Sequence, residues 1–364
     1  MIQVGYFAIP REGGDDRTRK ELSVDAIDPF LCTHIVVGFA RIRDNVIVPE
    51  AEEDYEIYEN IVKLKEQNPN LKILLSLGGG STDGGFPMLV RDPDAVLVFA
   101  SSTREFLIRY GFDGLDLDWE FPAWPALRRD RSEKKLFTQL VCQLNQSLKQ
   151  PPSLFLTLAA AGAKSIIDRS YEIKKLAEYV DFVFLMSYDY HIFWPYLPFT
   201  GHNAPLFKRR IEKMYFATMN VQWSACYWVN KGMPKQKLVI GIPTYGRTWR
   251  LLISYWDSIS SPAIGQGIAK GILSYIEAQS FICEGAKEYF DEESKVPFAT
   301  RGRHWISFED SRSVREKTLW IKDQGFAGVM TWNLNCDDWI GVVSGKKFEL
   351  HHIIKDILFD KLPP

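Results

Sequence analysis

The sequence lacks the long apolar run that a membrane-spanning helix requires. No segment approaches the roughly 18 consecutive apolar residues needed to cross a bilayer, although 46% of the 364 residues are hydrophobic. The chain begins with Met1 and Ile2 and continues directly into a strand-like segment, without the apolar core of a signal peptide. We therefore expect no insertion into a membrane, and a cleaved leader in a longer natural chain stays open.

The sequence also lacks an excess of positive charge. It contains 44 Lys and Arg residues against 46 Asp and Glu residues, and its formal net charge is −2. A protein that binds nucleic acid uses clustered cationic side chains to neutralise phosphates. The composition therefore argues against nucleic acid as a partner.

Cysteine is scarce and scattered, with five residues at Cys32, Cys142, Cys226, Cys283 and Cys336. No Cys-x-x-Cys pair and no His spacing typical of a zinc site accompany them. We therefore predict mostly buried thiols and no metal centre. The sequence also has no Gly-x-Gly-x-x-Gly loop after its first strand-like segment, which a dinucleotide-binding fold would place there.

Short apolar segments rich in β-branched residues recur along the chain and predict about eight strands. They cover residues 2–7, 34–39, 72–77, 114–120, 155–160, 182–188, 238–243 and 328–332. Amphipathic stretches of helical period lie between most of them, such as 53–66, 94–110, 132–148, 172–179 and 313–323. Eight units of strand and helix predict an α/β fold, a closed (β/α)8 TIM barrel with a parallel sheet. An open doubly wound sheet is the alternative.

One interval breaks this alternation. About 60 residues separate the strand-like segment that ends near Gly246 from Trp305, and a compact domain rarely contains a plain loop of that length. The interval contains turns rich in Gly, Ser and Pro, and a helix is predicted over 271–283. We predict a barrel formed by residues 1–247 and 306–364, with a small α+β insertion formed by residues 248–305.

The most informative segment is the predicted strand 114–120, where three acids alternate with apolar residues. Because successive side chains of a strand point to opposite faces, Asp116, Asp118 and Glu120 share one face, with roughly 6.6 Å between neighbours. The apolar residues between them would pack into the core. Carboxyl groups so close together raise one another's pKa, so at least one should donate a proton near neutral or mildly acidic pH.

The ends of the other predicted strands deliver polar and aromatic side chains. In a TIM barrel the carboxyl ends of all strands meet at one mouth, where the active site lies. The residues that arrive there are Tyr6, Phe39, Met186, Tyr188, Asp189, Tyr245, Arg247 and Trp332. Trp194 follows in a strand-to-helix loop, where binding is favoured over packing. Flat aromatic faces cover the apolar faces of sugar rings, although large aromatics also serve as core residues.

These motifs resemble those of the glycoside hydrolase family 18 chitinases, in particular the animal type with an insertion before the eighth strand. Residues 112–122 match the family signature Asp-Gly-x-Asp-x-Asp-x-Glu, residues 76–79 match its Ser-x-Gly-Gly element, and residues 186–189 match its sixth-strand motif. The likeness covers nearly the whole chain. It implies retaining hydrolysis of β-1,4-linked N-acetylglucosamine polymers, with the acetamide of the substrate as the nucleophile.

The resemblance also implies a role for each matching residue. Glu120 would be the general acid and then the base, Asp118 would orient the acetamide, and Asp116 would share a proton with Asp118. Tyr188 would donate a hydrogen bond to the acetamide oxygen, and Trp332 would form the floor of the cleavage subsite. The other binding residues would be Tyr6, Phe39, Met186, Asp189, Trp194, Tyr245 and Arg247. The resemblance implies no metal or organic cofactor, and we expect a monomer that binds chitin or a chitooligosaccharide.

The sequence departs from the family pattern at three places. Gly5 stands where animal chitinases place the Cys that pairs with Cys32, and no Cys follows the eighth strand to pair with Cys283. Both family disulfides are therefore predicted to be missing, so an extracellular location rests on the resemblance alone. Gly80 stands where the family commonly has Trp, and we expect weaker sugar binding there by about 1 to 2 kcal/mol.

Two alternatives to a chitinase stay open on the sequence. One is a chitinase-like lectin that binds chitooligosaccharides without turnover, since Gly80 removes an aromatic contact. The other is an enzyme with the same mechanism that acts on N-glycan cores or chitobiose. Glu120 argues against the lectin, because lectin-type relatives typically lose the acid. The insertion after Tyr245 argues against short substrates, because in chitinases it deepens the groove for a long polymer.

Overall fold

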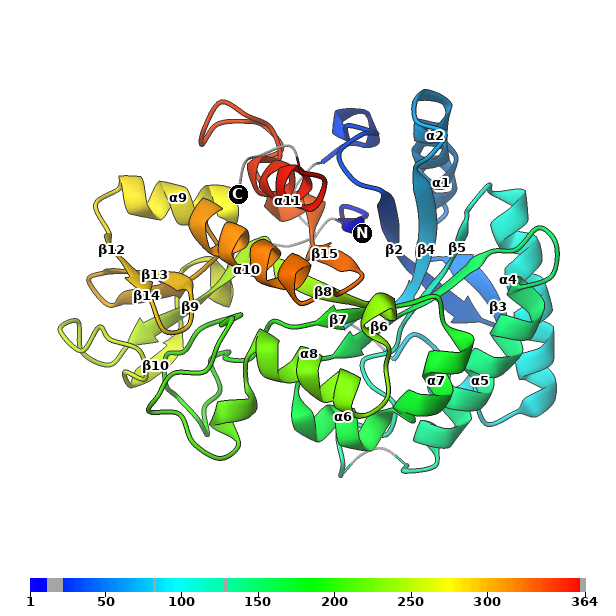
Figure 1. Cartoon of the computed structure of the whole chain (residues 1–364), viewed down its shortest axis with the longest axis horizontal. Coiled ribbons are helices and arrows are strands. Elements are labelled where there is room, and N and C mark those ends of the chain that lie inside the picture. Colours follow the sequence, from blue (N-terminus) through cyan, green and yellow to red (C-terminus); the bar gives the residue numbers. More distant parts are fainter. Residues whose placement is uncertain (12–21, 81–82, 128–129, 361–364) are drawn as a thin grey trace.

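A closed barrel of parallel strands forms the centre of the computed structural model, which describes residues 1–11, 22–80, 83–127 and 130–360. The strand order is β1-β15-β8-β7-β6-β5-β4-β2, and β1 pairs with β2 to close the barrel. The strands are β1 Ile2–Ala8, β2 His34–Arg43, β4 Lys72–Gly78, β5 Gly114–Asp118, β6 Phe155–Ala161, β7 Phe182–Met186, β8 Leu238–Pro243 and β15 Gly328–Trp332. The predicted TIM barrel is confirmed, and the open doubly wound sheet is excluded (Figure 1).

Helices cover the outside of the barrel (Figure 1). They are α1 Asp54–Val62, α2 Leu64–Gln67, α3 Phe86–Leu89, α4 Pro93–Arg109, α5 Glu133–Leu148, α6 Lys164–Ser170, α7 Ile173–Tyr179, α8 Val221–Asn230, α10 Ser311–Asp323 and α11 Glu349–Leu358. Helix α4 shows why such a segment becomes helical at a defined residue. The Asp92 carboxylate accepts hydrogen bonds from two backbone N–H groups of its first turn, and Pro93 occupies the first helical position. In the described ranges, none of the helices has the length and apolar character to span a membrane.

The side chains of the barrel strands alternate between two cores. Val36, Tyr6 and Phe184 belong to an apolar cluster inside the barrel. Their neighbours along the strands point outward and pack against the helices in a much larger cluster, which includes Leu115 and Leu117 of β5. The inward positions of β5 are therefore its acids, and the barrel interior is where the carboxyl groups lie.

Strand β2 is longer than predicted and forms a hairpin that the sequence interpretation missed. It extends past residue 39 to Arg43 and pairs antiparallel with β3, Val46–Pro49. The two residues between them, Asp44 and Asn45, have φ values of 51° and 61°, as expected for a two-residue hairpin turn. This turn sequence was the signal that could have revealed the hairpin.

A second, antiparallel sheet follows β8 and lies to one side of the barrel (Figure 1). Its strands are β9 Tyr245–Leu251, β10 Ala263–Gln266, β11 Ile272–Ser274, β12 Lys287–Asp291, β13 Val296–Arg301 and β14 His304–Ser307. The helix predicted over 271–283 is α9 Tyr275–Cys283, which starts late because β11 precedes it and Ser274 caps it. The sheet reaches slightly beyond residues 248–305 at both ends, and the division into two domains stays a prediction.

The prediction of mostly buried thiols was wrong. All five cysteines lie in described parts of the chain and none is disulfide-bonded, but only Cys32 and Cys336 are buried, while Cys226 and Cys283 are exposed. The exposed pair lies on α8 and at the last residue of α9, where helix faces meet solvent. A Cβ atom at Gly5 would lie 3.1 Å from the Cys32 Sγ atom, so Gly5 does stand beside the unpaired thiol.

Candidate active site

A cavity of about 760 Å³ lies at the carboxyl ends of the barrel strands. This volume falls within the range of pockets that bind small ligands. Nine of the twelve predicted site residues line it: Tyr6, Phe39, Asp118, Glu120, Met186, Tyr188, Asp189, Arg247 and Trp332. The barrel topology therefore brings together side chains that are far apart in the sequence.

The other three predicted residues lie outside the cavity lining. Asp116 is 0% exposed and lies deeper in the barrel. Tyr245 is also buried, and its hydroxyl donates a hydrogen bond of 2.7 Å to Asp189, which does line the cavity. Trp194 lies on the connection after β7 and is 55% exposed. Asp116 and Tyr245 thus support cavity residues, whereas the structure does not bring Trp194 to the cavity wall.

Three hydroxyl groups fix the deepest acid. The hydroxyls of Tyr6, Ser76 and Thr157 each donate a hydrogen bond of 2.7 Å to the Asp116 carboxylate. Burial raises the pKa of Asp116, and these three hydrogen bonds oppose that shift. Ser76 belongs to the Ser-x-Gly-Gly element, so that element has a role in the site as well as in the turn. Thr157 was not predicted, because a single Thr on a strand carries no signal of its own.

Asp118 is the most perturbed acid of the cavity. It is 4% exposed, and its Oδ1 atom is buried without a hydrogen-bond partner among the described residues. Burial raises its pKa well above the ordinary value, the neighbouring Glu120 and Asp116 raise it further, and Arg41 lowers it. A buried oxygen without a protein partner is costly and uncommon in folded proteins. Its position at the cavity floor suits an N–H donor supplied by a ligand.

We expect Asp118→Asn to change how stability depends on pH. Because the pKa of Asp118 is raised on folding, the folded protein binds this proton more tightly than the unfolded chain does. The protonated Asp118 therefore adds to the free energy of unfolding. This contribution is fully present below the unfolded-state pKa of about 3.9 and is lost as pH rises through the raised pKa of the folded state. The Asn variant carries no such charge, so its free energy of unfolding should fall less steeply over that range.

Urea unfolding of parent and variant at a series of pH values measures this difference. Asp323→Asn is the matched control, because Asp323 is exposed at the end of α10. A pH dependence of Asp118→Asn that coincides with that of the parent would contradict the assignment of Asp118 as a carboxyl with a raised pKa.

Glu120 follows the end of β5 and is exposed, in contrast to the two buried acids. An exposed carboxyl group at a cavity mouth can exchange protons with a ligand and with water. A Cβ atom at Gly80 would lie 3.0 Å from the Glu120 Oε1 atom. A side chain at position 80 would therefore contact the Glu120 carboxylate, which would have to shift slightly to accommodate it.

Glycine is required in the turn that follows β4. Gly78 and Gly79 have φ values of 111° and 87°, in the left-handed region that other residues rarely adopt. A Cβ atom at Gly79 would lie 2.7 Å from the Phe39 ring, and one at Gly78 would collide with the backbone oxygen of Asp118. The two glycines let the turn pass closely between the acid strand and the aromatic residue.

Aromatic rings cluster at the cavity wall that also carries Asp118 and Glu120. The rings of Phe39 and Trp332 are stacked, with 5.6 Å between centroids and 27° between planes, and Tyr6 meets Trp332 edge-on at 5.4 Å. The Trp332 Nε1 atom is buried and has no hydrogen-bond partner in the described parts of the chain. The cluster therefore combines apolar rings with a hydrogen-bond donor, a combination that suits the binding of a sugar.

An ion pair forms another part of the wall. The Arg247 Nε and Nη2 atoms each lie 2.7 Å from an oxygen of the Asp189 carboxylate, a two-point contact that fixes both side chains. Tyr188 packs edge-on against Tyr245 with 6.0 Å between ring centroids. Burial raises the pKa of Tyr188 well above its ordinary value, so its hydroxyl stays protonated and can donate a hydrogen bond.

Three charged residues of the cavity wall were not predicted from the sequence: Arg11, Arg41 and Glu50. They lie beyond the ends of the predicted strands: Arg11 on the connection after β1, Arg41 on β2 within the hairpin, and Glu50 directly after β3. The ranges that the structure describes contain no group of three His, Cys, Asp or Glu side chains arranged to hold a metal ion.

The family profile "Glycosyl hydrolases family 18" matches residues 3–337. The chain therefore belongs to glycosyl hydrolase family 18. Chitinase-3-like protein 2 of Homo sapiens is 36% identical over 330 residues, which cover 86% of this chain and 82% of that protein. Chitotriosidase-1 of Mus musculus is 35% identical over 328 residues, which cover 86% of this chain and 69% of that protein.

Solved structures of the family superpose closely on this fold. Human YKL-39, described as a pseudo-chitinase with retained chitooligosaccharide binding properties, has a TM-score of 0.90 and 32% identity over 98% of this chain and 99% of that one. The Group IV chitinase of Ostrinia furnacalis, solved in complex with allosamidin, has a TM-score of 0.91 and 29% identity over the whole of both chains. The relatives thus include chitinases as well as a protein described as a pseudo-chitinase.

Proposed function

We propose that this protein hydrolyses β-1,4-linked N-acetylglucosamine chains of chitin or chitooligosaccharides, with the acetamide of the substrate as the nucleophile. The observation that carries the proposal is the buried Asp118 oxygen without a partner, next to the exposed carboxyl group of Glu120. This pair supplies an acceptor for the acetamide N–H and a proton donor for the glycosidic oxygen. Chitooligosaccharide binding by YKL-39 supports the choice of substrate class.

In the first step, Glu120 donates its proton to the glycosidic oxygen as the bond between that oxygen and C1 breaks. The acetamide carbonyl oxygen forms a bond to C1 and closes a positively charged oxazolinium ring, so no enzyme nucleophile is needed. Asp118 accepts a hydrogen bond from the acetamide N–H and offsets the positive charge. Tyr188 donates a hydrogen bond to the acetamide oxygen and orients it towards C1.

In the second step, the Glu120 carboxylate takes a proton from a water molecule whose oxygen bonds to C1. The bond between C1 and the acetamide oxygen breaks, which restores the acetamide and the protonated acid. Each step inverts C1, so the product keeps the β configuration. Asp116 raises the pKa of Asp118 electrostatically and would share a proton with it. Trp332 lines the cavity and would support the sugar at the cleavage point.

A lectin that binds chitooligosaccharides without turnover is the second candidate. Two observations favour it: the description of YKL-39 as a pseudo-chitinase, and Gly80 in place of an aromatic platform. The presence of Glu120, Asp118 and Tyr188 around one cavity favours the enzyme.

The purified chain should release fluorophore from a fluorogenic chitobioside or chitotrioside, and proton NMR of a chitotetraose digest should show the β anomer of the product first. Assays from about pH 4 to pH 8 span the range in which a raised carboxyl pKa supports acid catalysis. Binding of chitotetraose without turnover at any of these pH values would establish the lectin instead. Early release of the α anomer would contradict the acetamide mechanism.

A further inference from the structure

Arg41 is a charged residue of the cavity wall that the mechanism above does not use. It lies on β2 beyond Phe39, where the strand enters the hairpin with β3, and its side chain is only 13% exposed. It lines the same cavity as Gly80, Glu120 and Trp332. A cation at this depth is uncommon unless partners hold it.

Two partners hold the guanidinium of Arg41 in place. Its Nη1 group donates a hydrogen bond to the backbone oxygen of Gly78, and its Nη2 atom lies 3.0 Å from the Glu50 Oε2 atom. Gly78 is the last residue of β4 and is followed by the turn that contains Gly80. The hydrogen bond therefore holds Arg41 close to Gly80. Because the guanidinium is fixed before a ligand arrives, little side-chain entropy is lost when one binds.

The charge of Arg41 also reaches the acids. Burial, Glu120 and Asp116 raise the pKa of Asp118, whereas Arg41 lowers it. The buried phenols of Tyr6, Tyr171 and Tyr188 also interact electrostatically with Asp118, and they are neutral because burial raises their pKa values. Arg41 therefore favours the ionised form of Asp118 against the effect of its acidic neighbours.

We propose that Arg41 is a substrate-binding and positioning residue that contacts the sugar unit bound beside Gly80, in place of an aromatic platform, and supports Asp118 as an acceptor for the acetamide. This inference rests on the proposed function of the cavity as a site for N-acetylglucosamine chains. A guanidinium is planar and weakly hydrated, so its face can cover a sugar ring much as an aromatic ring does. Gly80 has no side chain, and it lines the same cavity as Arg41, so the space between them can hold a sugar unit.

The first measurement compares the affinities for chitotetraose and chitobiose by calorimetry. All variants carry Glu120→Gln, so that the ligand is not hydrolysed during the measurement. We expect Arg41→Gln to weaken chitotetraose binding about tenfold, the effect of one good contact of about 1.4 kcal/mol, and to change chitobiose binding less. Arg43→Gln is the matched control. It removes the same charge from the same strand, but Arg43 is exposed and lies outside the cavity lining. The control should bind both ligands within twofold of the parent.

The second measurement is the pH dependence of chitotetraose affinity, which a merely structural role of Arg41 would not shift. Removal of a positive charge near Asp118 disfavours its ionised form, so the pH dependence of Arg41→Gln should move to higher pH. Arg41→Lys keeps the charge but loses the planar fork. It should keep the pH dependence of the parent and still bind chitotetraose more weakly.

The outcomes separate this inference from the proposed function. If the parent binds chitotetraose without hydrolysing it and Arg41→Gln weakens that binding, the proposed hydrolysis fails and the role of Arg41 stands. If the parent hydrolyses chitotetraose and Arg41→Gln matches Arg43→Gln in affinity and pH dependence, the role of Arg41 is wrong. Should circular dichroism show that Arg41→Gln is unfolded, Arg41→Lys carries the test, and parental affinity in that variant overturns the proposal. A parent that does not bind chitotetraose overturns both.

Discussion

Glu120→Gln is expected to lower kcat on a fluorogenic chitotrioside by a factor of about 10² to 10⁴, the usual contribution of a general acid and base. Gln has nearly the same shape and cannot donate a proton to the glycosidic oxygen or take one from water. Because the Glu120 side chain is exposed at the cavity mouth, the substitution creates no void in the core. We expect the variant to fold as the parent does and to bind chitotetraose with similar affinity.

Glu50→Gln is the matched control for this loss. Glu50 lines the same cavity and its side chain is 43% exposed, but it is not among the groups that perturb Asp118. A change of a few-fold or less is expected from its contact with Arg41. Equal losses in both variants, or activity of Glu120→Gln near that of the parent, would show that Glu120 is not the proton donor.

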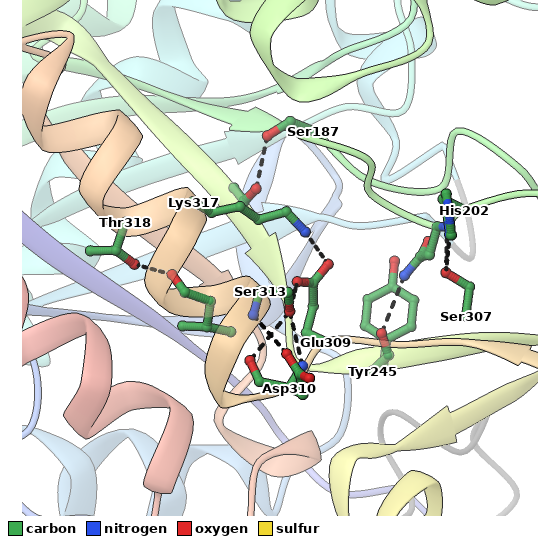
Figure 2. A network of polar contacts seen from close by, with 12 residues as sticks. Ser187, His202, Tyr245, Ser307, Glu309, Asp310, Ser313, Lys317 and Thr318 are labelled. Atoms are coloured by element: carbon green, nitrogen blue, oxygen red, sulfur yellow. Dashed lines mark hydrogen bonds and ion pairs between the residues drawn. The ribbon is translucent and has the colours of Figure 1, made fainter. Parts of the chain in front are cut away.

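Lys317→Met is expected to lower the free energy of unfolding by about 3 to 5 kcal/mol, the usual cost of removing one partner of a buried ion pair. Lys317 of α10 meets Glu309, which precedes the helix, and both side chains are almost completely buried (Figure 2). The Ser313 hydroxyl donates a second hydrogen bond of 2.6 Å to the same carboxylate. Without the ammonium group, Glu309 is left as an uncompensated buried acid.

Lys322→Met is the control on the same helix. Lys322 pairs with Asp360, whose side chain is 85% exposed, and a surface pair contributes about 0 to 1 kcal/mol. The double variant Lys317→Met with Glu309→Gln should recover much of the loss, because no buried charge remains. Urea unfolding measures all four proteins. Equal losses in the two Lys variants would contradict a stabilising role of the buried pair.

The defect of Lys317→Met should also depend on pH. Burial raises the pKa of Glu309 in the parent, and Lys317 opposes that shift. Without the Lys317 ammonium, the pKa of Glu309 in the variant should be higher still than in the parent. The folded variant is therefore more stable at low pH, where Glu309 is protonated, and loses stability as pH rises and Glu309 ionises. The difference from the parent should therefore be smaller under mildly acidic conditions than at neutral pH.

Most barrel strands could be predicted because they are nearly continuous apolar runs buried on both faces, and β5 because its buried acids alternate with leucines. Strands β8 and β15 have the predicted bounds, and five of the other six differ from the prediction by two residues or fewer. The exception is β2, which continues into the hairpin with β3. Its last residues, from Ala40 to Arg43, alternate apolar and charged side chains, a weaker local signal than an apolar run.

The acids could be found because their spacing is local. Alternation along one strand is enough to place Asp116, Asp118 and Glu120 together without knowledge of any other element. Arg41 and Thr157 could not be found in this way. Each is an ordinary residue in its own segment and becomes part of the site only because the closed barrel places β6 beside β5 and β2 one strand further away, across β4. Trp194 was predicted from its loop position, and loop position does not determine which surface a side chain faces.

The sequence alone determined the strand-and-helix alternation, the barrel and the three acids, because hydrophobic periodicity and side-chain alternation act over a few residues. Tertiary structure decided the properties of the site. It buried Asp118 without a partner for one oxygen, placed three hydroxyls on Asp116, brought Arg41 to the cavity wall and left Cys226 and Cys283 exposed. Burial, partner geometry and pKa depend on contacts between segments far apart in the chain, and only the closed barrel specifies those contacts.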